Sequence, residues 1–183
     1  MKTGKVFIAY GMILFLSFII TLMFNIFIFQ TYTVEGESMD PTLQNQELLY
    51  TSKLNYWLDS LPKYNDIVVI DSHTDKKRTF CNDIKNTNLI ELFIESPTEF
   101  FIVKRVIGKP GDILEIKDHN VYRNEKQLTE PYIKEMMYPS MDHKWKVPKN
   151  HVFVMGDNRN HSTDSRVIGC IPIDHVLAKV IFR

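Results

Sequence analysis

The sequence has little of what marks a disulfide-rich or metal-binding protein. Only two cysteines, Cys81 and Cys170, occur in 183 residues, and two thiols in separate segments make no disulfide scaffold. They fit an oxidised pair in an exported domain and two free thiols equally well. The six histidines stand singly, without a His-x-x-x-His or Cys-x-x-Cys pair. Neither a metal nor another cofactor is therefore expected.

An excess of either charge is also absent. The 22 basic residues balance 22 acidic ones, and no stretch is dense in Lys or Arg. We therefore expect no nucleic-acid partner, because nucleic-acid binding needs a concentrated positive surface. Repeats and Gly/Ser-rich linkers are missing too, and the length suits one compact unit plus an anchor. We expect a monomer.

No Asp, Glu, Lys or Arg occurs between residues 6 and 34, and residues 6–29 are almost wholly apolar. A helix needs about 20 such residues to cross a hydrocarbon core, so we expect a transmembrane signal-anchor over 6–29. Lys2 and Lys5 precede it, and the positive-inside tendency places residues 1–5 in the cytoplasm and residues 30–183 outside the cell membrane. A cleaved signal peptide has a shorter apolar core of about 7–15 residues. The alternative, a buried helix of a soluble domain, requires apolar surroundings on every side.

Beyond the apolar run, the pattern predicts a mostly β domain. Short segments rich in Val, Ile and aromatic residues are typical of strands, and they occur at 47–51, 66–71, 89–95, 99–107, 112–117, 120–123, 151–155 and 176–182. Pro110 and Gly111 suit the central positions of a type II turn. A short helix is expected at 54–61, and the irregular stretch 124–148 is expected to form a loop or a small lobe.

Ser38 follows the apolar run closely, and Lys104 lies among apolar residues in the predicted strand 99–107. A serine hydroxyl needs a base to become a nucleophile, and lysine acts as a base only when neutral. With an ordinary pKa near 10.4, a neutral lysine at pH 7 costs about 4.6 kcal/mol, and burial can lower the pKa by about 3–5 units. In a strand, Ile102 and Val106 share the face of Lys104, while Arg105 points away. The pattern therefore suits a Ser/Lys dyad.

Four segments, at residues 36–43, 66–70, 104–112 and 156–166, together resemble bacterial type I signal peptidases. They read GESMDPTL, DIVVI, KRVIGKPGD and GDNRNHSTDSR, and their order behind one apolar segment also matches that family. The resemblance implies an antiparallel β-sheet catalytic domain and a serine endopeptidase without a cofactor. It leaves residues 74–97 and 124–148 unmatched.

The resemblance also implies roles for individual residues. Ser38 would be the nucleophile and Lys104 the general base, and Ser162 would hydrogen-bond and orient the lysine amine. Taken alone, Ser38 is an ordinary turn or cap serine, and Lys104 an ordinary strand lysine with its amine in water. His161 beside Ser162 suggests a Ser/His arrangement as an alternative, but no orienting acid accompanies it.

Supporting residues follow from the same match. Asp164 with Arg166 and Asp157 with Arg105 would form two ion pairs that brace the site. The alternative is ordinary surface pairs worth about 0–1 kcal/mol.

The oxyanion hole is the least defined part of the resemblance. The Ser38 backbone N–H is the expected donor, and Met39 follows it in the motif. Gly36 stands where some family members carry a second serine hydroxyl, so a backbone N–H or water would supply the second donor. Asp40 brings a carboxylate near the dyad, or simply forms the turn before Pro41.

The expected substrate is an exported preprotein with a cleavable signal peptide, read through small residues one and three positions before the cut. An extended substrate would add as a strand beside residues 32–36 and 100–104. A surface that rests on the lipid bilayer, or alternatively core packing, is expected for six large apolar side chains: Trp57, Leu58, Leu61, Met136, Met137 and Trp145.

Other functions share parts of this pattern. A self-cleaving repressor would carry a DNA-binding portion in place of the apolar segment. A conjugation-linked maturation peptidase would use the same Ser/Lys chemistry. A catalytically impaired assembly factor, such as one serving pilus formation, would lack the nucleophile or the base, and this chain keeps both.

Overall fold

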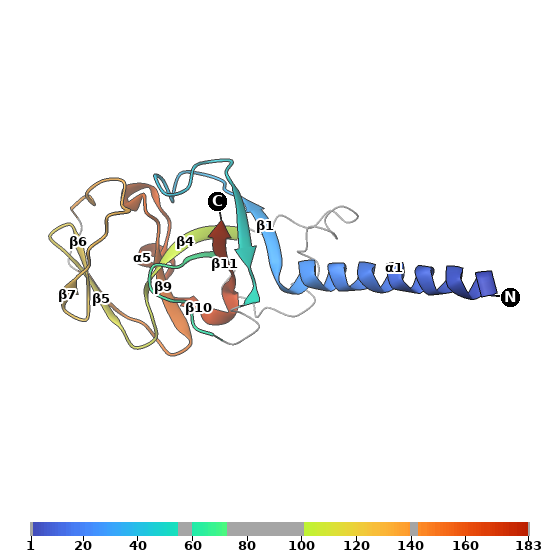
Figure 1. Ribbon diagram of the computed structural model, residues 1–183. Helices are drawn as coiled ribbons and strands as arrows, with labels where there is room; N and C mark the ends of the chain where they lie inside the picture. The colour runs from blue at the N-terminus through green and yellow to red at the C-terminus, as the bar shows by residue number, and fades with distance from the viewer. Residues whose placement is uncertain (1, 55–59, 73–100, 140–142, 183) are drawn as a thin grey trace.

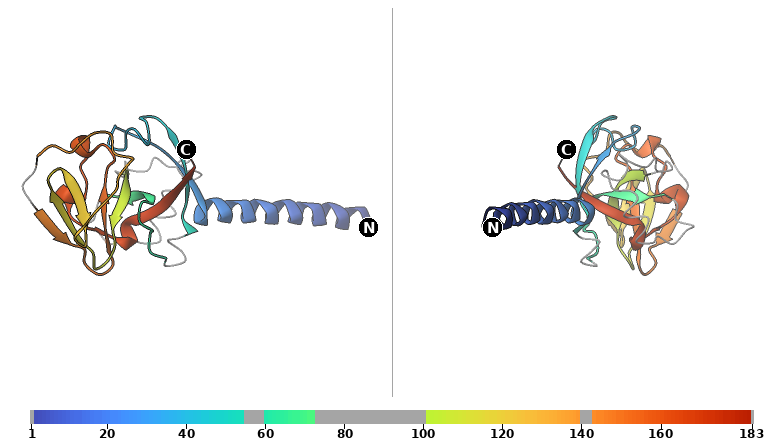
Figure 2. Two further views of the ribbon diagram at one scale, coloured as in Figure 1. Left: turned by 60° about the vertical axis from the view of Figure 1, so that its left-hand side comes forward. Right: turned by 90° about the vertical axis from the view of Figure 1, so that its right-hand side faces the viewer.

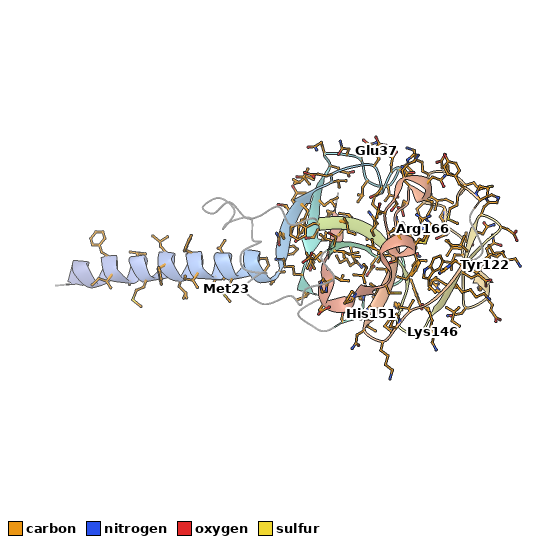
Figure 3. All side chains as sticks on the ribbon, turned by 180° about the vertical axis from the view of Figure 1, so that it is seen from behind. Met23, Glu37, Tyr122, Lys146, His151 and Arg166 are labelled. Carbon is orange, nitrogen blue, oxygen red and sulfur yellow. The ribbon has the colours of Figure 1, made fainter. Side chains whose placement is uncertain are left out.

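The N-terminal apolar segment forms one long helix, α1 (Lys2–Phe27). The computed structural model describes residues 2–54, 60–72, 101–139 and 143–182. Figure 1 shows α1 projecting from a β-rich body, and both views in Figure 2 agree. In Figure 3, Met23 lies on this projecting helix and Tyr122 lies at the other end of the molecule. The predicted helix is present, but it ends at Phe27 rather than at residue 29, because Phe29 begins the first strand.

The membrane span expected over 6–29 is not confirmed. In the part of the chain that the structure describes, no helix combines the length and the apolar character that crossing a membrane requires.

The larger of two antiparallel sheets has seven strands in the order β1-β2-β11-β3-β4-β9-β10. The strands are β1 (Phe29–Thr33), β2 (Leu48–Ser52), β3 (Ile67–Asp71), β4 (Phe101–Gly108), β9 (His151–Met155), β10 (Ile171–Pro172) and β11 (Val176–Phe182). Most of them coincide with predicted strands, because their β-branched and aromatic residues alternate between the two faces of the sheet. The predicted mostly β domain is confirmed.

The smaller sheet lies at the end of the molecule away from α1 (Figure 1), with the order β7-β6-β5-β8. Its strands are β5 (Ile113–Lys117), β6 (Asn120–Arg123), β7 (Lys126–Gln127) and β8 (His143–Lys146). The stretch 124–148 therefore contributes two strands to a small lobe. The turn before β5 forms as predicted, since Gly111 has φ +91° and the Asp112 N–H donates to the Lys109 carbonyl oxygen at 3.0 Å.

An apolar core joins the two sheets. Its buried members are Ile107, Leu114, Ile116, Val121, Met137, Val147, Phe153 and Met155. Met137 belongs to this core and Trp145 packs against it, so these two side chains do not form a surface for the bilayer. Met136 and Leu61 are exposed. Trp57 and Leu58 lie outside the described residues.

Three short helices complete the described fold: η1 (Arg159–His161), α5 (Ser165–Ile168) and η2 (Ile173–His175). Most of the helix expected at 54–61 and the strand expected at 89–95 lie outside the described residues. Cys170 carries a free, half-buried thiol, and Cys81 lies outside the described residues.

Candidate active site

Ser38 and Lys104 lie together in space although 66 positions separate them in the chain. Lys104 Nζ donates to Ser38 Oγ at 2.7 Å and to the Val103 carbonyl oxygen at 3.0 Å. Lys104 comes from β4, where it is paired with Val68 of β3. β3 holds the lysine backbone on one side, and pairing with β9 begins at the next residue, Arg105. The two groups expected to form a dyad are thus within hydrogen-bonding distance.

Lys104 is only 3% exposed. Burial lowers its pKa to about 8, against a smaller opposing effect of the Asp164 and Asp157 carboxylates. A pKa of about 8 leaves roughly a tenth of the amine neutral at pH 7. The remaining cost of the neutral form is then about 1.4 kcal/mol. This environment makes the amine a usable base near neutral pH.

The segment that carries Ser38, residues 36–43, is anchored by apolar packing. Met39 and Leu43 are fully buried in a cluster with Val34 and Leu49. The Leu43 N–H donates to the Met39 carbonyl oxygen at 3.0 Å, which closes a turn. Met39 therefore supports the site by holding the serine segment against the sheet. We call residues 36–43 the nucleophile loop.

Gly36 has φ +89°, a backbone conformation that favours glycine. Its N–H donates to the Asn45 side-chain oxygen at 3.0 Å. Gly36 was an expected contributor to the oxyanion hole, but its N–H already has an acceptor. The Ser38 N–H, by contrast, has no hydrogen-bond acceptor within the described ranges. One of the two expected donors is therefore available.

Ser162 lies close to Ser38 but does not make the hydrogen bond to Lys104 that the sequence predicts. Its Oγ is buried and has no partner among the residues described. A Cβ added at Gly156 would collide with both Ser162 Oγ and the Ser38 carbonyl oxygen, so all three positions crowd together. Only glycine at 156 permits this approach. His161 is exposed, which gives no support to a Ser/His arrangement.

Both expected ion pairs are present, and they are not surface pairs. Arg105 donates to the two Asp157 oxygens, from Nε at 2.8 Å and from a terminal nitrogen at 2.5 Å. Arg166 Nε donates to Asp164 at 2.8 Å, and both carboxylates are fully buried. Asp164 also accepts from the Gly156 N–H at 3.0 Å. Asp164 thus acts on the segment beside Ser38, and within the described chain it forms no hydrogen bond or ion pair with Ser38 or Lys104.

Several supporting contacts were not expected from the sequence. The Thr42 hydroxyl donates to Asp157 at 2.5 Å, which ties the nucleophile loop to the segment after β9. Arg159 and Glu130 form a buried pair at 2.6 Å. The Tyr132 ring lies under the Arg105 guanidinium, 4.0 Å from its carbon atom. No local sequence pattern predicts these contacts, since the two partners of each contact come from distant parts of the chain.

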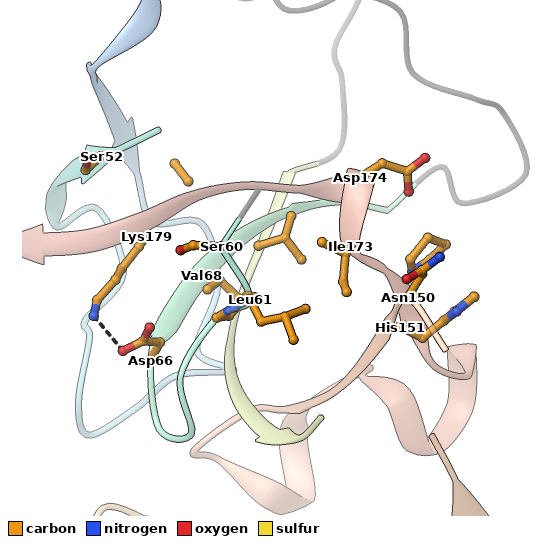
Figure 4. A pocket seen from close by; sticks show the side chains of 14 residues that line it. Ser52, Ser60, Leu61, Asp66, Val68, Asn150, His151, Ile173, Asp174 and Lys179 are labelled. Atoms are coloured by element: carbon orange, nitrogen blue, oxygen red, sulfur yellow. Dashed lines mark ion pairs between the residues drawn. The ribbon is translucent and has the colours of Figure 1, made fainter. Parts of the chain in front are cut away.

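A cavity of about 920 Å³ lies elsewhere, among residues of β3, β9 and β11 (Figure 4). Lys179 and Asp66 form an ion pair at its edge, with 2.6 Å between Nζ and Oδ1. Neither Ser38 nor Lys104 lines this cavity. The candidate active site is therefore separate from this cavity.

Comparison with known proteins identifies the family. The family model described as "Signal peptidase, peptidase S26" matches residues 7–183. The chain is 33% identical to signal peptidase I T of Bacillus subtilis over 99% of this chain and 88% of that protein. It is 32% identical to signal peptidase I of Bacillus caldolyticus, over 92% and 86% of the two chains. It is 34% identical to signal peptidase IB of Staphylococcus aureus, over 91% and 83%. The chain thus belongs to the signal peptidase family, peptidase S26, and is a serine endopeptidase.

Proposed function

We propose that this chain removes signal peptides from exported preproteins, with Ser38 as nucleophile and Lys104 as general base. The observation that carries the proposal is the 2.7 Å contact between Lys104 Nζ and Ser38 Oγ, made by a buried lysine of lowered pKa. Membership of the signal peptidase family supports the substrate class.

The chemistry proceeds in two halves. The neutral Lys104 amine takes the hydroxyl proton as Ser38 Oγ attacks the scissile carbonyl, and the oxyanion that forms accepts from the Ser38 N–H. Lys104 then gives its proton to the leaving amine, so the mature protein departs and an acyl-enzyme remains. Water, deprotonated by Lys104, attacks the ester. Collapse of the second oxyanion releases the signal peptide and returns the proton to Ser38.

We also propose that α1 anchors the enzyme in the cell membrane, with the N-terminus in the cytoplasm and the catalytic domain outside. Support comes from the charge-free run over residues 6–34 and from Lys2 and Lys5 ahead of it. Large apolar side chains of α1, such as Phe7, Leu14 and Phe15, are exposed. A bilayer would cover them, and it would bring the site close to membrane-tethered substrates.

Two strand edges suit an extended substrate. β4 pairs with β3 from Phe101 onward, but with β9 only from Arg105 onward, so residues 101–104 have one edge without a partner strand in the described chain. The outermost strand, β1, lies nearby, since the Tyr32 and Phe101 ring centroids are 5.4 Å apart. We propose that the signal peptide adds as a strand here, with alternate small side chains facing the protein.

The test is cleavage of a model preprotein with alanine at positions one and three before the cut. We expect Ser38→Ala and Lys104→Ala to lose at least about 10³-fold in kcat/KM, because each removes one half of the nucleophile and base pair. Lys117→Ala changes an exposed lysine at the end of β5 and serves as the control. Activity that survives either dyad substitution would rule out the mechanism. Equal cleavage of a preprotein with large residues at those two positions would rule out the docking mode.

A further inference from the structure

Asn158 is the residue next to Asp157, is fully buried, and has no role in the steps above. It makes two hydrogen bonds to the nucleophile loop. Its side-chain Nδ2 donates to the Glu37 carbonyl oxygen at 3.1 Å. Its backbone N–H donates to the Ser38 carbonyl oxygen, also at 3.1 Å. One residue thus holds the carbonyl groups on both sides of the Ser38 Cα.

These two carbonyl groups belong to the peptide units that flank Ser38. A trans peptide unit is planar, and its C=O and N–H groups point in opposite directions. Holding the Glu37 carbonyl therefore also sets the direction of the Ser38 N–H, which belongs to the same unit and points away from Asn158. That N–H has no acceptor in the described part of the chain. It is the donor that the oxyanion of the proposed mechanism requires.

The orientation of the Asn158 amide follows from its partner. Glu37 O can only accept, so the amide nitrogen must face it, and the amide oxygen must point the other way. Asn158 Oδ1 is buried without a hydrogen-bond partner among the described residues. A buried acceptor without a partner costs stability, and such groups in native proteins call for an explanation. An explanation is that the amide nitrogen is needed to fix the orientation of the Glu37–Ser38 peptide unit.

We propose that Asn158 is a positioning residue for the oxyanion hole, one that fixes the Ser38 N–H in the direction where substrate oxygen becomes negatively charged. The inference rests on the proposed function. A donor fixed in advance needs no reorganisation as the charge develops. The hydrogen bond to Glu37 O also polarises the peptide unit and makes the Ser38 N–H a stronger donor. Asn158 itself does not touch the substrate.

Asn158→Asp is the sharpest test, because it keeps the shape and replaces the donor to Glu37 O with a second acceptor. Asn158→Ala and the milder Asn158→Ser remove the contact without repulsion. We expect kcat for preprotein cleavage to fall at least about tenfold in Asn158→Asp, with KM within about twofold of wild type, because the lost interaction matters only as charge develops. Asn160→Ala is the matched control, since the Asn160 side chain donates to the Met136 carbonyl oxygen instead of the nucleophile loop.

A second measurement distinguishes a role in positioning the Ser38 N–H from a general destabilisation of the fold. A peptide boronic acid with an alanine side chain beside the boron forms a tetrahedral adduct with Ser38. Its affinity should fall in parallel with kcat across the three variants, while urea denaturation monitors folding. The proposal fails if folded Asn158 variants keep wild-type kcat. It also fails if KM rises while boronate affinity stays unchanged.

These outcomes differ from a failure of the proposed function. In that case wild type would not cleave the preprotein, or Ser38→Ala would cleave it equally well. If wild type is active, Ser38→Ala is inactive and Asn158→Asp matches wild type, only the role of Asn158 is lost.

Discussion

At the scale of single residues, Lys104 has its amine 2.7 Å from Ser38 Oγ and almost no contact with solvent. Two influences act on its pKa in opposite directions. Burial disfavours the ammonium form, whereas the Asp164 and Asp157 carboxylates favour it, and burial has the larger effect. The result, a pKa of about 8, lies about 2.5 units below the ordinary value of 10.5. The lysine is thus partly neutral, and not permanently so, near pH 7.

The pH dependence of kcat/KM follows from that pKa. Because the base must be neutral, activity should be lost as pH falls through about 8. We expect kcat/KM to rise about tenfold per unit between pH 6 and 7, and to level off above about pH 8.5. The measurement is cleavage of the model preprotein across this range, with folding checked at each pH. A flat profile from pH 6 to 8 would show that Lys104 is not the base.

At the scale of elements, the site is assembled where β4, the nucleophile loop and the segment after β9 meet. Asp157 connects them, since it accepts from Arg105 of β4 and from Thr42 of the nucleophile loop. The Asp157 side chain is 0% exposed and that of Arg105 is 9% exposed. A buried pair of this kind gives weak evidence of net stability. Removing one partner is nevertheless costly, because it leaves the other charge buried without a counter-charge.

Asp157→Asn should therefore lower the free energy of unfolding by about 3–5 kcal/mol, because it leaves the Arg105 guanidinium buried without its counter-charge. Glu115→Gln is the matched control. Its partner Lys144 has a side chain that is 66% exposed, so we expect a loss of about 0–1 kcal/mol. Urea denaturation of both variants gives the comparison. Similar losses in the two variants would contradict the argument that burial decides the cost.

The same elements show what the sequence can and cannot predict. Strands such as β3 and β9 were predicted because their apolar residues form recognisable short runs. β8 was missed, since His143–Lys146 contains Trp145 as its one apolar residue, and its strand conformation depends on pairing with β5. The contacts of Asn158 could not be predicted either, because it meets Glu37 across 121 positions and no local pattern encodes that meeting.

In the candidate active site, too, some features were predictable from the sequence and others were not. The motifs and their order resemble a known family, and this resemblance predicted that Ser38 lies near Lys104. The structure brings the two side chains together. Ser162 lacks the predicted hydrogen bond because of how its side chain is rotated. The Gly36 N–H is unavailable because it donates to the Asn45 side chain. Both are set by tertiary packing. Sequence motifs therefore predicted which side chains lie together better than they predicted the contacts that orient them.

At the scale of the whole molecule, α1 stands apart from the β domain (Figures 1 and 2). Exposed apolar side chains occur along it, from Val6 to Phe24. In water such a surface has a large unfavourable hydration free energy. A lipid bilayer removes this cost, and a protein partner of comparable length would do the same. The two possibilities predict different responses to charge at the middle of the helix.

The double substitution Leu14→Lys, Phe15→Lys distinguishes them. In a bilayer each charge at mid-helix costs about 2.5–3.5 kcal/mol on translocon-insertion scales. Flotation of the full-length variant with liposomes should then fall well below that of wild type, and cleavage of a membrane-tethered preprotein should slow. Cleavage of a short soluble peptide should not change, because Ser38 and Lys104, the proposed dyad, lie in the β domain. Val167→Lys, at an exposed apolar position of that domain, should float like wild type. Unchanged flotation of the double variant would mean that α1 does not hold the enzyme in the membrane.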